Sequence, residues 1–219
     1  MSVATSMATS EKHGGARPLK QAILIAGPTA SGKSALALEF AASRNGTIVN
    51  ADSMQVYSVL NLVTARPSDA ELSAAPHRLY GHVHPGRPYS TGAWLRDVER
   101  LAAGGDLDGR TPVFAGGTGL YFRALLGGLS QMPEIPQPVR DRWRAELAES
   151  GPPALHRLLQ ERDPQAAAAI GSADGQRILR ALEVLEVVGR SITDLRAEAG
   201  RPLVDPATAE RYVVEPDRA

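Results

Sequence analysis

The stretch GPTASGKS at residues 27–34 has the residue types and the spacing of a loop that binds phosphate groups. Gly27, Gly32, Lys33 and Ser34 occupy the fixed positions of the pattern G-x-x-x-x-G-K-[ST]. In such loops the backbone N–H groups and the lysine hold phosphates, and the final hydroxyl binds Mg²⁺. The pattern predicts a diphosphate or nucleotide ligand, ATP included. It leaves the reaction open, because ATPases, GTPases and kinases share it.

This loop lies between a predicted strand and a predicted helix. The apolar run QAILIA (21–26) is short enough for a buried strand, and SALALEFAASR (34–44) favours a helix. The N–H groups and the dipole at a helix start attract anions, so this context is the one that a phosphate loop requires. We expect Lys33, the only lysine after residue 20, to reach its ligand from an exposed loop.

Further strands and helices alternate along the first part of the chain. TIVNAD (47–52) and TPVFAGG (111–117) are predicted strands, and YSTGAWLRDVERLAAGG (89–105) is a predicted helix capped by Ser90 or Thr91. This alternation predicts an α/β fold, a P-loop-type parallel sheet with helices on both faces. Ligand-binding loops in such sheets follow the carboxyl ends of the strands. We therefore expect three loops to meet at one edge of the sheet, namely GPTASGKS (27–34), ADSMQVY (51–57) and GGTGLY (116–121).

The chain divides into four predicted segments. Residues 1–18 are small, polar and aperiodic, which is typical of a disordered tail, and residues 19–132 form the predicted α/β core. Residues 133–202 begin with a proline-rich hinge and contain no predicted strand, so we expect a helical insertion. RYVVEP, within 203–219, is predicted to return to the sheet. The predicted helices of the insertion are VRDRWRAELAES, PPALHRLLQERD, PQAAAAIG and ADGQRILRALEVLEVVG, the last with Ile178 on its apolar side.

The composition excludes several kinds of site. The 219 residues include no cysteine, which excludes disulfides, thiolate metal sites and a cysteine nucleophile. No apolar run approaches the roughly 18 residues of a membrane span, and the net charge is zero, so any nucleic-acid contact must come from local arginine clusters. His77, His82 and His84 lack metal-ligand spacing, and we assign them no metal. We expect a soluble, cytoplasmic monomer.

Taken in order, the motifs resemble the tRNA dimethylallyltransferase family. GPTASGKS, ADSMQVY, TARPS (64–68), GGTGLY and DGQRILRALEV (174–184) follow that family's order and spacing over about residues 20–216. The resemblance implies transfer of a dimethylallyl group from dimethylallyl diphosphate to N6 of adenosine 37, in tRNAs that read codons starting with U, with release of diphosphate. It implies a tRNA anticodon stem-loop as partner, contacted by the helical insertion at 133–202, and Mg²⁺ as cofactor.

The resemblance also implies roles for individual residues. Asp52 is the expected base for N6, Thr118 lies near the reacting centre, and Lys33 stabilises the leaving diphosphate. Ser34 is the implied Mg²⁺ ligand. The implied diphosphate or nucleotide site comprises Gly27, Pro28, Thr29, Ala30, Ser31, Gly32, Lys33 and Ser34. The implied tRNA-binding residues are Asp52, Ser53, Met54, Gln55, Thr118, Arg140, Gln176, Arg177, Ile178, Leu179 and Arg180.

Two departures from the family pattern accompany the resemblance. Arg66 stands where the family commonly has lysine, which keeps the charge and changes the hydrogen-bond geometry. Family members usually run on for many tens of residues, so we expect this chain to be shortened at its C-terminus.

Three alternatives stay open at this stage. The first is an adenylate isopentenyltransferase, which prenylates free AMP or ATP, and the second is a P-loop kinase that uses ATP. The third is a shortened product that binds diphosphate or tRNA without turnover. An ATP hydrolase is less well supported, because the strand TPVFAGGTG ends in glycines where a metal-binding aspartate would be expected.

Overall fold

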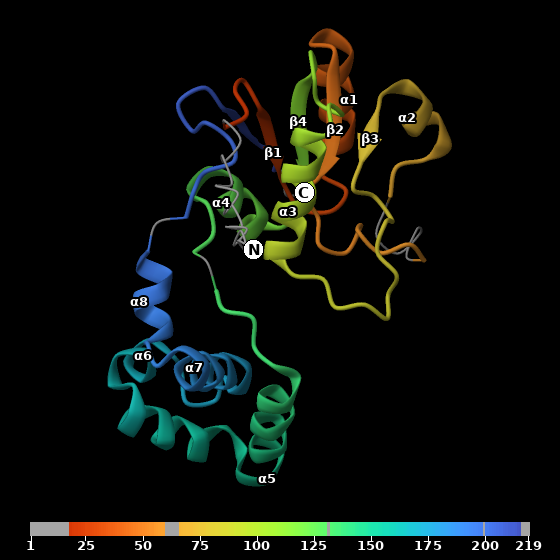
Figure 1. Ribbon diagram of the computed structural model, residues 1–219. Coiled ribbons are helices and arrows are strands. Elements are labelled where there is room, and N and C mark those ends of the chain that lie inside the picture. Colours follow the sequence, from red (N-terminus) through yellow and green to blue (C-terminus); the bar gives the residue numbers. More distant parts are fainter. Residues whose placement is uncertain (1–17, 60–65, 131, 199, 216–219) are drawn as a thin grey trace, which may run out of the picture. The chain divides into compact units, whose positions relative to one another are not determined.

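The structure is a computed structural model. The part of the chain that it describes comprises residues 18–59, 66–130, 132–198 and 200–215. The predicted tail at 1–18 lies outside this part except for Pro18, and Thr64 and Ala65 of the TARPS motif also lie outside it. The chain forms two compact units, which Figure 1 shows in ribbon form. We call residues 1–126 with 203–219 the α/β unit, and residues 127–202 the helical unit.

The α/β unit is built on a five-stranded parallel sheet in the order β3-β2-β4-β1-β5 (Figure 1). Its strands are β1 (Ile23–Ala26), β2 (Gly46–Asn50), β3 (His77–Arg78), β4 (Thr111–Gly116) and β5 (Glu210–Val213). The segment predicted to return to the sheet does so, because Tyr212 of β5 lies opposite Ile25 of β1 in parallel register. The predicted α/β class is confirmed.

Helices cover both faces of this sheet. They are α1 (Lys33–Ser43), α2 (Asp69–Ala74), α3 (Thr91–Ala103) and α4 (Gly119–Gly127). Val113 and Ala115 of β4 pack in the same apolar cluster as α1, whereas Phe114, between them, meets the Trp94 ring of α3 edge to face at 6.3 Å. The alternation follows from the two-residue repeat of a strand. Ser90 caps α3 as predicted, its Oγ accepting the Ala93 N–H at 3.2 Å.

The helical unit contains four helices within its described residues. They are α5 (Gln137–Arg162), α6 (Pro164–Ala169), α7 (Gly175–Val188) and α8 (Ile192–Ala197). α5 breaks at Gly151, whose φ of 75° is left-handed, and two prolines follow, so it consists of the two helices that the sequence predicted. Trp143, Leu159 and Ile178 are in the apolar core of this unit.

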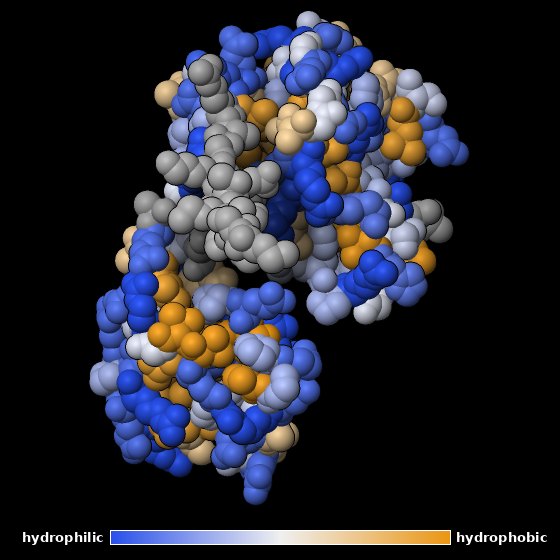
Figure 2. All heavy atoms as spheres, viewed as in Figure 1, coloured by the Kyte–Doolittle hydropathy of each residue, from blue (hydrophilic) through white to orange (hydrophobic). Residues whose placement is uncertain are grey.

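None of the described helices combines the length and the apolar character that crossing a bilayer requires. On the face that Figure 2 shows, hydrophilic and hydrophobic residues are interspersed over both units. Val187 and Val188, at the end of α7, are among the exposed hydrophobic residues.

Candidate active site

The phosphate loop runs from the end of β1 into the first turn of α1. Its tight turn uses left-handed backbone at Ala30, with φ 61°, and at Gly32, with φ 88°. Gly32 precedes the helix and has no side chain that could cap it. The first N–H groups of α1, which have no partner within a helix, are therefore left to a ligand at this turn.

Lys33 is buried, with 8% of its surface exposed, although most residues of the loop around it are exposed as expected. The side chain curls back over the loop, and its Nζ donates to the Pro28 carbonyl oxygen at 2.7 Å. Burial lowers the pKa of Lys33, and the nearby Asp52 carboxylate acts in the opposite direction. A cation in such a desolvated position interacts more strongly with a diphosphate than it would in water.

A cavity of about 320 Å³ opens beside the loop. Its lining residues are Thr29, Ala30, Ser31, Gly32, Lys33, Ser34, Gln55, Arg66 and Glu71. The cavity thus joins the phosphate loop to the ADSMQVY and TARPS motifs. The buried Ser31 Oγ has no hydrogen-bond partner among the described residues. Because buried hydroxyls are normally satisfied, an acceptor or donor on a bound ligand is the natural partner for it.

The Asp52 carboxylate is held by local backbone and by a buried asparagine. Its Oδ1 accepts the Met54 N–H at 2.9 Å. The Asn50 side chain brackets the Asp52 backbone, since Oδ1 accepts the Asp52 N–H at 2.9 Å and Nδ2 donates to the Asp52 carbonyl oxygen at 3.0 Å. A Cβ at Gly117 would lie 3.2 Å from Asp52 Oδ2, so glycine there leaves space beside this oxygen.

Thr118 joins the GGTGLY loop to the loop that carries Asp52. Its Oγ1 accepts the Ser53 N–H at 2.9 Å, and its own N–H donates to the Ala51 carbonyl oxygen at 3.2 Å. A Cβ at Gly117 would lie 3.4 Å from the Gly27 carbonyl oxygen of the phosphate loop. The three loops therefore meet at the carboxyl edge of the sheet, as the alternation of strands and helices predicted.

The residues at this edge fit a Mg²⁺ that arrives with its phosphate ligand. Ser34 is exposed at the start of α1 and lines the cavity, so its hydroxyl offers one hard oxygen. The described residues include no group of three acidic or histidine side chains that would hold a metal by themselves. Mg²⁺ typically takes one or two protein oxygens and completes its shell with phosphate oxygens and water. The donor set is of this kind.

The remaining residues of the predicted RNA-contact set belong to the helical unit. Gln176 and Arg177 are exposed on the first turn of α7, and Arg177 Nε lies 3.2 Å from Asp174 Oδ2. Arg140 of α5 is half-buried. Arg180, also half-buried, donates to the Pro133 carbonyl oxygen at 3.3 Å.

Two apolar residues of that set contribute to the core of the helical unit. Ile178 is fully buried, and Leu179 packs half-buried against the same core. The inclusion of the Ile178 side chain among the RNA contacts is thus corrected, because this side chain belongs to the core of the helical unit.

The sequence interpretation missed Asn50 and its partner on α3. Asn50 is fully buried, and its carbonyl oxygen accepts the Trp94 Nε1–H at 2.8 Å. Trp94 in turn stacks on Tyr121 of the GGTGLY motif, with ring centroids 4.1 Å apart, and burial raises the pKa of Tyr121 to about 12. An amide at the end of a buried strand, directly before Ala51 and Asp52, was the available signal.

These features define a class of protein, a P-loop α/β protein with a helical unit inserted before its last strand and a carboxylate beside its phosphate site. Comparison with known families narrows the class. The sequence model of the IPP transferase family matches residues 55–219, and that of isopentenyl transferases matches residues 20–87. The chain belongs to the IPP transferase family.

Individual relatives agree with this assignment. The chain is 62% identical over 201 residues to a tRNA dimethylallyltransferase of Mesorhizobium japonicum, covering 92% of this chain and 62% of that protein. It is 62% identical over 200 residues to a tRNA dimethylallyltransferase of Chelativorans sp., covering 91% of this chain and 68% of the relative. The chain thus spans less than two thirds of the length of the Mesorhizobium protein.

A solved structure has the same fold. It is that of a eukaryotic dimethylallyltransferase acting on tRNA, with a TM-score of 0.75 and 24% sequence identity. The match covers 89% of this chain and 48% of that one. At this identity the likeness supports the fold of the described residues and carries no residue roles.

Proposed function

We propose that this chain transfers a dimethylallyl group from dimethylallyl diphosphate to N6 of adenosine 37 in tRNAs that read codons starting with U. The observation that carries the proposal is the position of the Asp52 carboxylate, which lies near the buried Lys33 of the phosphate loop, at the edge where the three loops meet. Two relatives of high identity bear the name of this activity. A base beside a diphosphate site is what prenyl transfer to an amine requires.

The phosphate loop serves the leaving group. As the C–O bond to the diphosphate breaks, negative charge grows on the diphosphate oxygens, and Lys33 with the N–H groups of the first turn of α1 stabilises it. The Ser31 hydroxyl gains its missing partner from the same oxygens. Ser34 would hold a Mg²⁺, which when bound neutralises part of this charge.

Asp52 serves the acceptor. The adenine amine is a weak nucleophile, because its lone pair is delocalised into the ring. Asp52 Oδ1 is occupied by the Met54 N–H, whereas Oδ2 faces the space that Gly117 leaves open. This oxygen accepts the N6 hydrogen bond, orients the amine, and takes the proton as the N–C bond forms. Adenosine 37 must leave its stack to reach it, as in other enzymes that act on bases.

Exposed residues of the helical unit would contact the anticodon stem-loop. Gln176 and Arg177 lie exposed at the start of α7, where their side chains suit a phosphate. The Arg177 guanidinium, now beside Asp174, would exchange that exposed carboxylate for a backbone phosphate. Arg140, Leu179 and Arg180 join this proposed contact as half-buried residues.

We also propose that the protein acts in the cytoplasm as a monomer. The tRNA acceptor supports the location. Light scattering of the purified protein measures its mass directly, and a dimer mass would contradict the second part.

The test is transfer of a radiolabelled dimethylallyl group under single-turnover conditions with Mg²⁺. The acceptors are an anticodon stem-loop with A37, the same stem-loop with G37, and free AMP. We expect label only on the A37 stem-loop. Label on AMP would favour an adenylate isopentenyltransferase, and binding of both substrates without transfer would leave a binding protein. Phosphate transfer from ATP would indicate a kinase.

A further inference from the structure

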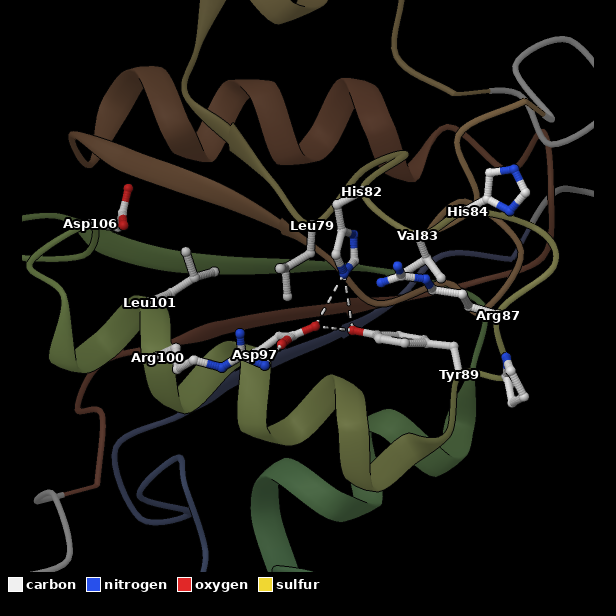
Figure 3. A pocket seen from close by; sticks show the side chains of 11 residues that line it. Leu79, His82, Val83, His84, Arg87, Tyr89, Asp97, Arg100, Leu101 and Asp106 are labelled. Carbon is white, nitrogen blue, oxygen red and sulfur yellow. Dashed lines mark hydrogen bonds and ion pairs between the residues drawn. The ribbon is translucent and has the colours of Figure 1, made fainter. Parts of the chain in front are cut away.

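A second cavity, of about 460 Å³, lies in the α/β unit between α3 and the segment that precedes it (Figure 3). Three polar side chains point toward one another in its wall, namely His82, Tyr89 and Asp97, which we call the His82 cluster. The Tyr89 hydroxyl donates to Asp97 Oδ2 at 2.6 Å. His82 Nε2 lies 3.1 Å from the Tyr89 oxygen and 3.2 Å from Asp97 Oδ2. The proposed reaction uses none of these three residues.

The donor and acceptor types in the cluster indicate which way its hydrogen bonds run. A tyrosine hydroxyl has one hydrogen, and here it is directed to Asp97. His82 Nε2 therefore has no donor facing it from Tyr89, and it must itself carry a hydrogen and donate. Arg100 adds an ion pair to the other oxygen of Asp97. The Asp97 side chain, only 13% exposed, thus collects several donors, and hydrogen bonds to an ionised group are stronger than neutral ones.

The backbone around His82 is paired with the loop that follows Asp52. The Gly81 N–H donates to the Gln55 carbonyl oxygen, the Val83 N–H to that of Val56, and the Ser58 N–H to that of Val83, each at 2.9 Å. Residues 81–83 and 55–58 thus lie side by side like two short strands. Val56 and Val83 are buried, and His82, between its neighbours, reaches α3.

The other end of the same loop is also attached to α3. Trp94 donates to the Asn50 carbonyl oxygen, and the Asn50 side chain holds both backbone groups of Asp52. Trp94 and Asp97 are three residues apart on the helix, so they lie on neighbouring turns of one face. One helix therefore holds the loop at residue 50 directly, and at residues 55–58 through His82.

We propose that His82, Tyr89 and Asp97 are positioning residues, which fix the segment 55–58 and with it the orientation of Asp52 toward the acceptor. The role in catalysis rests on the proposed function, whereas the attachment of the loop does not. The phosphate loop makes no contact with the cluster among the hydrogen bonds described, so binding of the prenyl diphosphate should be insensitive to it.

The test compares the parent with His82→Ala, His82→Gln, Tyr89→Phe and the control His84→Ala. His84 lies two residues further along the same segment, is exposed, and accepts only the local Gly86 N–H in the described structure. Amide hydrogen exchange at Ser58 and Val83, followed by NMR, reports the attachment of the loop. Single-turnover transfer to the anticodon stem-loop, with KM for each substrate, reports its effect on the reaction.

We expect His82→Ala to speed exchange at Ser58 and Val83 on the order of tenfold, and to lower the transfer rate by about the same factor. KM for dimethylallyl diphosphate should stay within about twofold of the parent. His82→Gln should restore most of the slow exchange and most of the transfer rate, because its amide N–H can still donate to Asp97. Tyr89→Phe, which keeps the ring, should also speed exchange and lower the transfer rate, each by less than His82→Ala does.

Exchange at Ser58 and Val83 that His82→Ala leaves as slow as in His84→Ala would overturn the proposal, whatever the activity. Faster exchange with an unchanged transfer rate would equally overturn the positioning role. A parent chain that transfers nothing would count against the proposed function, and the exchange comparison would still decide whether the cluster holds the loop.

Discussion

The two units both bury polar side chains, yet they use them differently. In the α/β unit Lys33 is buried at the start of α1 and Asn50 at the end of β2, and both contact backbone of the candidate site. In the helical unit the buried Asp163 caps α6 through the Ala166 N–H at 3.0 Å, and the buried Glu183 lies 3.6 Å from Arg180. Burial of a polar group is costly in either place. In the first unit it prepares a ligand site, and in the second it stabilises helices.

The largest expected effect is on the transfer rate, and it should distinguish the part-buried Asp52 from the buried Asp163. Asp52→Asn keeps the size and the hydrogen bond to Met54 and removes the charge that accepts the proton, so transfer should fall roughly 10²–10⁴-fold. Affinity for both substrates, measured at equilibrium, should change little. The matched change Asp163→Asn should leave transfer unchanged, and stability nearly so, because asparagine caps helices as well as aspartate does. Transfer by Asp52→Asn within about tenfold of the parent would remove Asp52 as the base.

The next effect concerns the helical unit alone. Leu159→Ala deletes a fully buried side chain from its core and should lower the free energy of unfolding by about 2–5 kcal/mol. Trp143 fluorescence in a denaturant titration reports this unit, whereas Trp94 reports the other. Binding of dimethylallyl diphosphate should persist, since its site lies in the α/β unit. Val187→Ala, at an exposed position, is the control, with a change below about 1 kcal/mol.

A smaller effect probes the buried cation. Lys33→Ala should weaken binding of dimethylallyl diphosphate by roughly 10–100-fold, as expected for the loss of one charge-assisted hydrogen bond. Calorimetry measures the affinity, and circular dichroism shows whether the fold is kept. The exposed Lys20 provides the matched variant, Lys20→Ala, which should bind like the parent. Equal affinities of the two variants for dimethylallyl diphosphate would show that Lys33 stabilises the loop and does not bind the diphosphate.

The smallest effect is expected on the surface of the helical unit. Arg177→Ala should weaken stem-loop binding a few-fold at low salt and less at high salt, because one phosphate contact and its released counterion are lost. The slope of log affinity against log salt should become shallower by about 0.7–0.9. Arg96→Ala removes an exposed arginine from the α/β unit and should leave the slope unchanged. If Arg177→Ala lost the same stem-loop affinity at low and at high salt, the cause would be damage to the packing of α7.

Local sequence patterns predicted the elements that local physics determines. The strand, loop and helix around residues 27–34, the Ser90 cap and the interruption of α5 at Gly151 all follow from neighbouring residues. Helix α2 was missed although its capping box was readable, since Ser68 and Glu71 bond each other's backbone N–H groups. Helices α4 and α8 and the two-residue strand β3 were missed too.

Tertiary contacts account for what the patterns did not predict. Lys33 is buried because its side chain folds onto Pro28, and Asn50 acquires its role from Trp94, which is 44 residues away in the chain. Ile178 shows two kinds of inference in conflict. The helical repeat placed it on the apolar side of its helix, the family resemblance placed it on RNA, and the structure follows the repeat.

The order in which the sheet is completed has a consequence during synthesis on the ribosome. β1 lies between β4 and β5, yet Glu210, which pairs with Ile23, is made only after the whole helical unit. At about 5–20 residues per second, one side of β1 waits roughly 10–40 s for its partner. The helical unit is continuous in sequence and can fold during that interval. Until then β1 presents an open strand edge, which is a site for aggregation, and we expect nascent chains halted before β5 to depend on chaperones.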